Sequence, residues 1–220
     1  MGSGSNHMAS VVYYTDSTLP NPIYRFCYET ARRACRDHEL IAVAQKPSPL
    51  FETADVTIVT GPKPRSHRSI YEQIRHGLLS ASHDPVFLLE HDVLYPLGFF
   101  HFIPPDLKRL WYNRHTYFMN RRGFFPCSDM LLSNCCGSRA LLRLAVEQRI
   151  TILHAGRTMR FAEFGMGFHD SCTTSDWRCE HPAIDIRHGQ NSTGMRDSDE
   201  VVACIPYWGS HESLRAALQL

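Results

Sequence analysis

The chain has 220 residues, of which 43% are hydrophobic and 20% are charged, and its formal net charge is +1. These values are typical of one soluble globular domain with a sizeable core, and they exclude a global basic field that would demand a nucleic-acid partner, although clustered basic residues permit a polyanionic one. No apolar run approaches the roughly 18 residues of a membrane-spanning helix, so we expect no membrane span.

The first ten residues, MGSGSNHMAS, have the composition of an expression-tag remnant, and we expect the domain to occupy residues 11–220. We expect no signal peptide ahead of the first strand. The eight cysteines do not form the pattern of a disulfide scaffold, and they lack the short Cys-x-x-Cys spacing of structural zinc sites. Reduced thiols and a cytoplasmic location are therefore expected.

The first half of the domain alternates between strand and helix patterns. Short apolar and β-branched runs predict strands, and apolar residues at helical spacing predict two helices, the second starting near Ser66 or Ser69. The predicted strands are 11–14, 40–44, 56–59 and 86–89, and the predicted helices are 23–38 and 65–79. This order implies right-handed crossovers and a mostly parallel sheet, and hence an α/β fold.

The second half, from residue 96 onward, is less regular. Residues 111–119 have the pattern of one strand, and residues 121–124 that of a hairpin turn. Residues 138–150 predict a helix, and 184–187 a short strand. From residue 161 onward Gly, His, Asp, Cys and Thr dominate, which indicates a region shaped around a ligand with little regular structure.

Two carboxylates, Glu90 and Asp92, follow directly after the apolar strand 86–89. Alternate residues of an extended chain share a face, so both side chains can point into one site. In an open α/β sheet ligands bind beyond the carboxyl ends of the strands, and carboxylate oxygens there can hold Mg²⁺ or Mn²⁺. The alternative is that these carboxylates only cap the next helix.

A second metal ligand from elsewhere in the chain would complete such a site. The candidate is His188, which follows the short strand pattern around Asp185 and precedes the glycine at 189. Mn²⁺ accepts imidazole together with carboxylates, whereas Mg²⁺ favours oxygen. A hydrogen-bonded turn histidine is the alternative for His188.

Basic residues cluster before the second predicted helix, at Lys63, Arg65 and Arg68. The N-terminus of a helix attracts phosphate through its free N–H groups, and arginine adds bidentate contacts. A solvated loop remains the alternative.

Taken together, the first strand ending in Thr15-Asp16, the segment FLLEHDVLYP and the segment IDIRHGQNSTG resemble glycosyltransferases of the GT-A fold. The resemblance is to the family-2-like group of bacteria and phages, and it covers about residues 11–208. It implies one GT-A-like, Rossmann-like domain with a nucleotide-binding half (11–95) and an acceptor half (96–220).

That resemblance also implies the chemistry of the site. A Mn²⁺- or Mg²⁺-dependent enzyme would move a hexosyl or pentosyl group from a nucleoside diphosphate sugar, such as a UDP-sugar, to a hydroxyl. Its Glu90-His91-Asp92 segment stands in place of a DxD motif, with Glu90 replacing the first aspartate, and Asp92 and His188 would bind the metal. Thr15, Asp16 and Arg68 would line the nucleotide pocket, and Glu90 and His91 would contact the donor.

An inverting enzyme of this kind also needs a carboxylate base that takes the proton of the acceptor hydroxyl. Asp129, Glu163 and Asp170 are the candidates. Glu163 is favoured because it lies between two phenylalanines, where partial burial would raise its pKa. Capping of a turn is the alternative role for Glu163.

The acceptor stays open at the level of sequence. Hydroxymethylated pyrimidine in phage DNA is one expectation, which would place the enzyme in the host cytoplasm, and a saccharide or lipid-linked surface glycan is the other. Two other classes use similar sheets: a nucleotidyltransferase, for which a Gly-rich loop after the first strand is missing, and a nucleotide-binding module without catalysis.

Overall fold

The computed structural model describes residues 8–167, 169–188 and 200–220. Within these residues the helices are α1 (Asn21–Ala34), α2 (His67–Ser80), α3 (Arg139–His154) and α4 (His211–Leu218). Three short 3-10 helices cover Pro49–Thr53, Phe99–His101 and Leu132–Asn134.

The largest sheet has seven strands. They are β1 (Ser10–Thr15), β2 (Glu39–Ala44), β3 (Val56–Val59), β4 (Val86–Glu90), β6 (Leu110–Asn113), β9 (Cys135–Gly137) and β10 (Thr174–Trp177). Their order is β10-β6-β9-β4-β1-β2-β3, and only β9 runs antiparallel to its neighbours. The predicted α/β fold with a mostly parallel central sheet is therefore confirmed.

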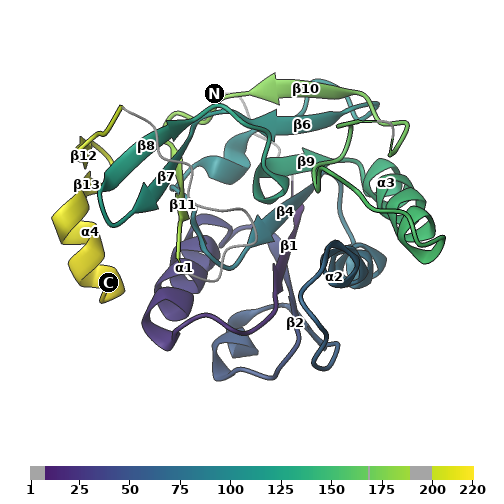
Figure 1. Cartoon of the computed structure of the whole chain (residues 1–220), viewed down its shortest axis with the longest axis horizontal. Coiled ribbons are helices and arrows are strands. Elements are labelled where there is room, and N and C mark those ends of the chain that lie inside the picture. The colour runs from purple at the N-terminus through teal and green to yellow at the C-terminus, as the bar shows by residue number, and fades with distance from the viewer. Residues whose placement is uncertain (1–7, 168, 189–199) are drawn as a thin grey trace, which may run out of the picture.

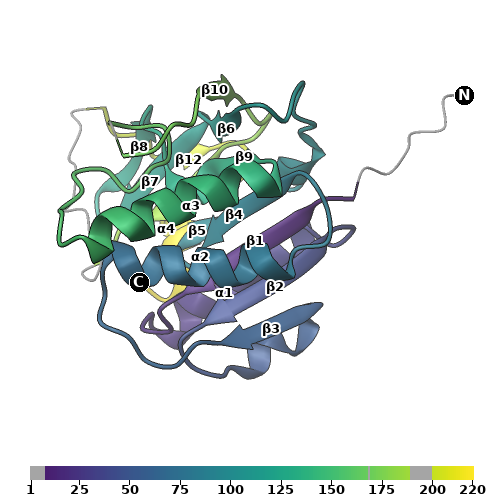
Figure 2. The ribbon, with the colours of Figure 1, turned by 90° about the vertical axis from the view of Figure 1, so that its right-hand side faces the viewer.

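Helices cover both faces of this sheet (Figures 1 and 2). Helices α2 and α3 lie side by side on one face, and α1 lies on the other. The period-2 alternation of β1 explains this arrangement, because Val12 and Tyr14 pack in the core under α2 and α3 while Val11 and Tyr13 pack in the core under α1. Strands β1 and β4 are thus buried on both faces, as their unbroken apolar runs require.

A smaller sheet builds the second half. It has the order β5-β11-β7-β8, formed by β5 (Val93–Leu94), β7 (Thr116–Asn120), β8 (Gly123–Cys127) and β11 (Ala183–Ile186). The two-stranded sheet of β12 (Cys204–Ile205) and β13 (Gly209–Ser210) lies beside α4 at the margin of the molecule (Figure 1).

The single strand predicted over residues 111–119 is wrong. Strands β6 and β7 belong to different sheets, and the chain turns between them at Arg114 and His115. The side chain of Asn113 stabilises this turn, because its Oδ1 accepts a hydrogen bond from the His115 backbone N–H at 3.1 Å. The hairpin turn predicted at 121–124 is confirmed, with Asn120 pairing with Gly123.

The predicted start of the second helix is confirmed at Ser66. The Ser66 side chain accepts a hydrogen bond from the Ser69 N–H, and the Ser69 side chain accepts one from the Ser66 N–H. This reciprocal cap fixes where α2 begins, beyond the carboxyl end of β3. Near the N-terminus, Ser10 is the first residue of β1 and is fully buried.

None of the helices in the described part of the chain is long and apolar enough to cross a membrane.

Candidate active site

A pocket of about 700 Å³ opens where β1 and β4 end. Its walls come from the end of β1, the start of α2, the end of β4, the small sheet and two irregular segments. The lining residues are Tyr14, Thr15, Asp16, Arg65, Ser66, His67, Ser69, Ile70, Gln73, Glu90, His91, Asp92, Phe118, Asp129, Met130, Leu131, Leu132, Ser133, Arg160, Phe161, Ala162, Glu163, Met166, Asp185 and Arg187. This is the position at which open α/β sheets bind ligands.

The side of the pocket next to β1 carries Thr15 and Asp16. Asp16 Oδ2 lies 2.7 Å from Arg65 Nε, and Asp16 Oδ1 accepts hydrogen bonds from the backbone N–H and the hydroxyl of Thr18. Gln73 from α2 donates a hydrogen bond to the Thr15 carbonyl oxygen at 2.6 Å. The end of β1 is therefore held against α2.

Arg68 does not line this pocket. Its guanidinium is about half exposed and pairs with Glu72 one turn further along α2, at 2.9 Å. Arg65, three residues earlier, is the arginine that lines the pocket beside Asp16. The expectation for Arg68 is corrected: because α2 begins at His67, Arg68 lies on the outward side of the helix, whereas Arg65 precedes the helix and reaches the end of β1.

Glu90 ends β4 and points to the same side of the sheet as Tyr14, its neighbour on β1. The Tyr14 hydroxyl donates a hydrogen bond to Glu90 Oε1 at 2.9 Å. The pKa of Glu90 is raised to about 8, mainly by burial and to a smaller extent by the nearby charges of Asp92 and Asp185. Burial and the neighbouring carboxylates therefore favour the protonated form of Glu90.

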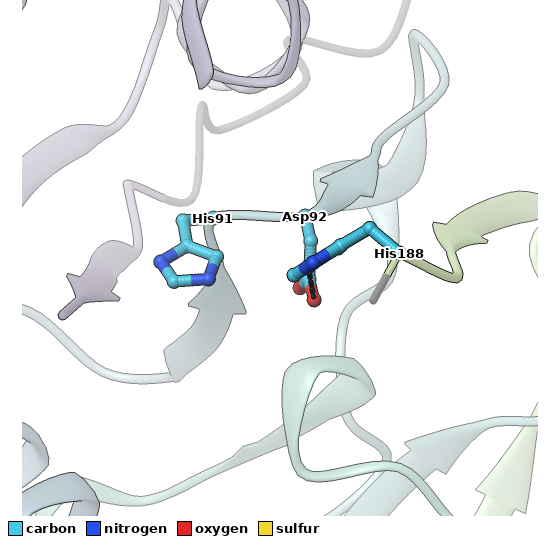
Figure 3. A group of neighbouring side chains, drawn as sticks. All are labelled: His91, Asp92 and His188. Carbon is cyan, nitrogen blue, oxygen red and sulfur yellow. Dashed lines mark hydrogen bonds and ion pairs between the residues drawn. The ribbon is translucent and has the colours of Figure 1, made fainter. Parts of the chain in front are cut away.

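Three side chains form a cluster with metal-ligand chemistry: His91, Asp92 and His188. One potential ligand atom from each lies within 4.8 Å of the others. His188 Nε2 lies 3.3 Å from Asp92 Oδ2, and Figure 3 shows His91 turned with one ring nitrogen toward Asp92. Two imidazoles and one carboxylate suit Mn²⁺ better than Mg²⁺, which prefers oxygen ligands.

The surroundings of His91 also fit a metal ligand. Its Nδ1 lies 2.6 Å from the Thr15 hydroxyl, so the nitrogen that faces Asp92 is left for a cation. Burial lowers the pKa of His91, which keeps the imidazole neutral as a ligand must be. Burial disfavours ionisation of Asp92, yet its hydrogen bond with His188 and the nearby His91 lower its pKa.

His188 is brought to this cluster by β11, which pairs with β5 and β7 in the small sheet. The Ile186 N–H donates to the Asp92 carbonyl oxygen at 2.9 Å, so the two segments are joined by backbone two residues before His188. The rest of the predicted turn, residues 189–191, lies outside the described residues.

Sequence reasoning gave no role to Asp185 and Arg187, which also line the pocket. Asp185 is buried, and burial together with the charge of Asp92 raises its pKa to about 7, although Arg187 opposes the shift. Arg187 Nε lies 3.2 Å from Asp185 Oδ1, and its guanidinium stacks on the Phe118 ring at 3.9 Å from the centroid. The alternation of Asp185 and Arg187 along β11 was the available signal, since both side chains then share one face with the pocket.

Two of the three candidate bases, Glu163 and Asp129, line the pocket. Burial raises the pKa of Glu163, in the direction expected from its phenylalanine neighbours. Asp170 lies elsewhere: its carboxylate is fully buried and pairs with the equally buried Arg149 at 2.8 Å. The expectation that Asp170 is a candidate base is corrected, because a carboxylate enclosed by an arginine has no access to an acceptor.

All eight cysteines lie in the described part of the chain, and none is in a disulfide. Within that part, His91, Asp92 and His188 form the one metal-type cluster, and it contains no cysteine.

Comparisons with known proteins identify the fold. TarS from S. aureus superposes with a TM-score of 0.51 at 10% identity, over 82% of this chain and 37% of TarS. GlyE from Streptococcus pneumoniae gives 0.48 at 12% identity, over 78% of this chain and 45% of GlyE. The fold is GT-A-like.

A glycosyltransferase involved in glycosylation of the major capsid of PBCV-1 gives a TM-score of 0.46 at 9% identity, over 78% of this chain and 81% of that chain. No family of known sequences matches the chain, and no curated protein does. The chain spans less than half of TarS and GlyE. At these identities the likeness concerns the fold alone.

Proposed function

We propose that this protein is a metal-dependent glycosyltransferase that moves a sugar from a nucleoside diphosphate sugar to a hydroxyl acceptor. The observation that carries the proposal is that, in a GT-A-like fold, one pocket is lined by Thr15 and Asp16 together with His91 and Asp92, and that His91 and Asp92 form a metal-type cluster with His188. The pocket opens at the carboxyl ends of β1 and β4, where open α/β sheets bind ligands, and two of the three cluster residues line it.

The donor would lie along the ends of β1 and β4. Beside Thr15, Asp16 offers a hydrogen-bond acceptor and Arg65 offers a positive charge. The nucleoside of the donor would bind there. Arg187 offers a second cation close to Asp92, where the diphosphate would lie. His91, Asp92 and His188 would hold Mn²⁺, which when bound supplies positive charge that stabilises the diphosphate leaving group.

In the reaction, the bond from the anomeric carbon to the diphosphate breaks and a bond from that carbon to the acceptor oxygen forms. The acceptor hydroxyl loses its proton to a base, and Glu163 is our first assignment for that base. Glu163 lines the pocket, and its burial raises its pKa toward the range in which a general base works best. Asp129, in the neighbouring segment, is the second candidate.

For the acceptor, the charge of the pocket favours a neutral saccharide over DNA. Among the described lining residues, six carboxyl side chains outnumber three arginines. Arg65, Arg187 and the metal ion would be engaged by the donor, so this lining leaves little positive charge for the phosphates of DNA, which basic surfaces bind. The apolar wall formed by Phe118, Leu131 and Phe161 suits the flat face of a sugar ring.

The test is a nucleotide-release assay with Mn²⁺ and a panel of UDP- and GDP-sugars. Each donor is given alone, with mono- and oligosaccharides, and with DNA containing 5-hydroxymethylcytosine or 5-hydroxymethyluracil. We expect release of nucleoside diphosphate that depends on a saccharide and is lost in Asp92→Asn. Release that depends on DNA would show that the acceptor is a modified base and not a saccharide. If the protein binds none of the donors, the transferase assignment is wrong.

A further inference from the structure

Arg149 of α3 is a buried arginine that binds the segment of the pocket wall that carries Glu163, residues 161–170. Its side chain is 0% exposed and is among the largest fully buried side chains of the described chain. A charge in this position costs several kcal/mol unless every donor finds a partner, so the bonds that Arg149 makes are informative.

Arg149 binds one segment at four points. Its Nη1 donates to the carbonyl oxygen of Phe161 at 2.6 Å, and its Nη2 donates to the carbonyl oxygens of Glu163 and, at 3.3 Å, Met166. Its Nε donates to Asp170 Oδ2 at 2.8 Å. The guanidinium thus spans a stretch of ten residues from within the core.

Asp170 completes the arrangement from the other side. Its Oδ1 accepts hydrogen bonds from the backbone N–H of Gly165 at 2.8 Å and of Cys172 at 3.2 Å. Gly165 has a φ of +76°, a backbone conformation that favours glycine. Space there is also tight, because an added Cβ would lie 2.3 Å from Thr174 Cγ2. Arg149 and Asp170 together therefore fix both ends of the turn that contains Gly165.

Tyr71 of α2 joins the same network. Its hydroxyl donates to the Ala162 carbonyl oxygen at 2.8 Å and accepts from Arg149 Nη1 at 3.3 Å. The guanidinium also lies near the rings of Tyr71 and Phe164, with Cζ 5.9 Å and 5.5 Å from their centroids. Helices α2 and α3 thus both bind this segment, through Tyr71 and Arg149.

This segment has no helix or strand of its own between α3 and β10 in the described residues. Yet its residues Phe161, Ala162, Glu163 and Met166 line the pocket, and each of their carbonyl oxygens binds Arg149 or Tyr71. We propose that Arg149, with Asp170, is a positioning residue that fixes the acceptor-side wall and thereby places the Glu163 carboxylate. The catalytic part of this inference rests on the function proposed above.

The first test measures hydrogen exchange in Arg149→Lys and Asp170→Asn. Lysine keeps the charge, but one ammonium group cannot reach the four acceptors, and asparagine removes the charge that pairs with Arg149. We expect amide exchange in residues 159–172 to rise at least about tenfold, which corresponds to about 1.4 kcal/mol of local stability, while exchange in β1 and β4 stays unchanged.

Arg75→Lys is the matched control. Arg75 also links α2 to α3, through Glu147 at 2.6 Å, but this pair is nearly half exposed and neither residue lines the pocket. The control should leave exchange in residues 159–172 unchanged. Unchanged exchange in Arg149→Lys, or an equal rise throughout the sheet, would overturn the inference.

The second test separates positioning from general stability by kinetics. In Arg149→Lys we expect kcat to fall at least about tenfold with the donor KM within twofold of the wild-type value, because the donor side of the pocket has separate supports. Equal losses in donor binding and turnover would contradict a positioning role. Should Arg149→Lys not fold, Tyr71→Phe tests the same wall, since it removes only the hydroxyl that binds Ala162, and unchanged exchange and kcat would then overturn the inference.

The two tests fail independently. Absence of turnover in the wild-type protein would refute the proposed function, while the exchange measurement would still decide whether Arg149 holds the segment.

Discussion

The Nε2 atom of His188 lies 3.3 Å from Oδ2 of Asp92, although 96 positions separate the two residues in the chain. The backbone hydrogen bond from Ile186 N–H to the Asp92 carbonyl oxygen and the pairing of Asp185 with Val93 fix this approach. The cluster is therefore built by strand pairing between β11 and β5, and its geometry does not depend on flexible side chains alone.

Substitution of single residues in the cluster should weaken metal binding. In Asp92→Asn and His188→Ala we expect Mn²⁺ affinity to fall by more than about tenfold, because each variant removes one of three ligands. The measurement is thermal unfolding against Mn²⁺ concentration, since an ion at 100 times its Kd stabilises the native state by about 2.7 kcal/mol. The exposed carboxylate of Asp176 on β10 supplies the control, Asp176→Asn, which should respond to Mn²⁺ like the wild type. An equal response in all variants would place the ion elsewhere.

The buried carboxyl of Glu90 should make the metal-free protein less stable as pH rises. Its pKa is raised to about 8 from the ordinary value of 4.5, so between these values the native state binds more protons than the unfolded state. The free energy of unfolding then falls with increasing pH, by up to about 1.4 kcal/mol per pH unit, and levels off above pH 8. Glu90→Gln cannot titrate and should lose this contribution.

Urea unfolding in the presence of a chelator, at intervals from pH 5 to 8.5, checks this prediction. The difference between wild type and Glu90→Gln isolates the contribution of Glu90 from those of buried histidines such as His91, whose lowered pKa acts in the opposite direction. Parallel curves for the two proteins would show that Glu90 is not responsible.

Arg65 and Arg68 should differ in their effect on the donor. Arg65 lines the pocket beside Asp16, whereas Arg68 points outward and pairs with Glu72. We expect Arg65→Gln to raise the donor KM by about tenfold or more, and Arg68→Gln to leave it within twofold. Steady-state kinetics on the two variants provides a matched comparison, and the reverse order would contradict this placement of the nucleotide.

Glu163→Gln should reduce kcat by at least about a hundredfold without weakening donor binding, because only the proton acceptor is removed. In the wild type, activity should rise with pH through the raised pKa of Glu163, since the base works in its ionised form. Asp129→Asn is the comparison. A larger loss in Asp129→Asn than in Glu163→Gln would reassign the base.

Close packing of α2 on β1 should make Gly77 intolerant of a side chain. A Cβ at Gly77 would lie 2.3 Å from Val12 Cγ1, so we expect Gly77→Ala to lower the free energy of unfolding by about 1–3 kcal/mol despite the higher helix propensity of alanine. Urea unfolding measures the change. Val12→Ala should relieve the clash, so the double variant should be less destabilised than the sum of the two single changes. A destabilisation equal to that sum, or larger, would refute this explanation.

Much of the first half of the fold could be predicted from sequence because its signals are local. Strands β1, β2, β3 and β4 are unbroken apolar or β-branched runs, and the Ser66 cap marks the start of α2. The break between β6 and β7 was missed because the aromatic runs on either side of it, 111–112 and 117–118, were combined into one strand. The polar residues 113–116 between them, Asn113 above all, were a local sign of the turn.

The site could be predicted only in part, for a different reason. Glu90, His91 and Asp92 are adjacent in sequence and follow a strand, so their common location needs no tertiary information. Asp170 was misplaced because its partner, Arg149, lies far from it in the sequence. Arg68 was misplaced although Glu72, four residues further along the predicted helix, was a local sign of an outward-facing pair. The exclusion of Asp170 depends on a partner 21 positions away.

The most direct test of the central claim is a crystal structure with Mn²⁺ and UDP, using anomalous scattering to locate the ion. We predict a Mn²⁺ peak bound by His91, Asp92 and His188, with the diphosphate on the ion and the nucleoside beside Thr15 and Asp16. A Mn²⁺ ion bound elsewhere, or a nucleotide outside this pocket, would contradict the account.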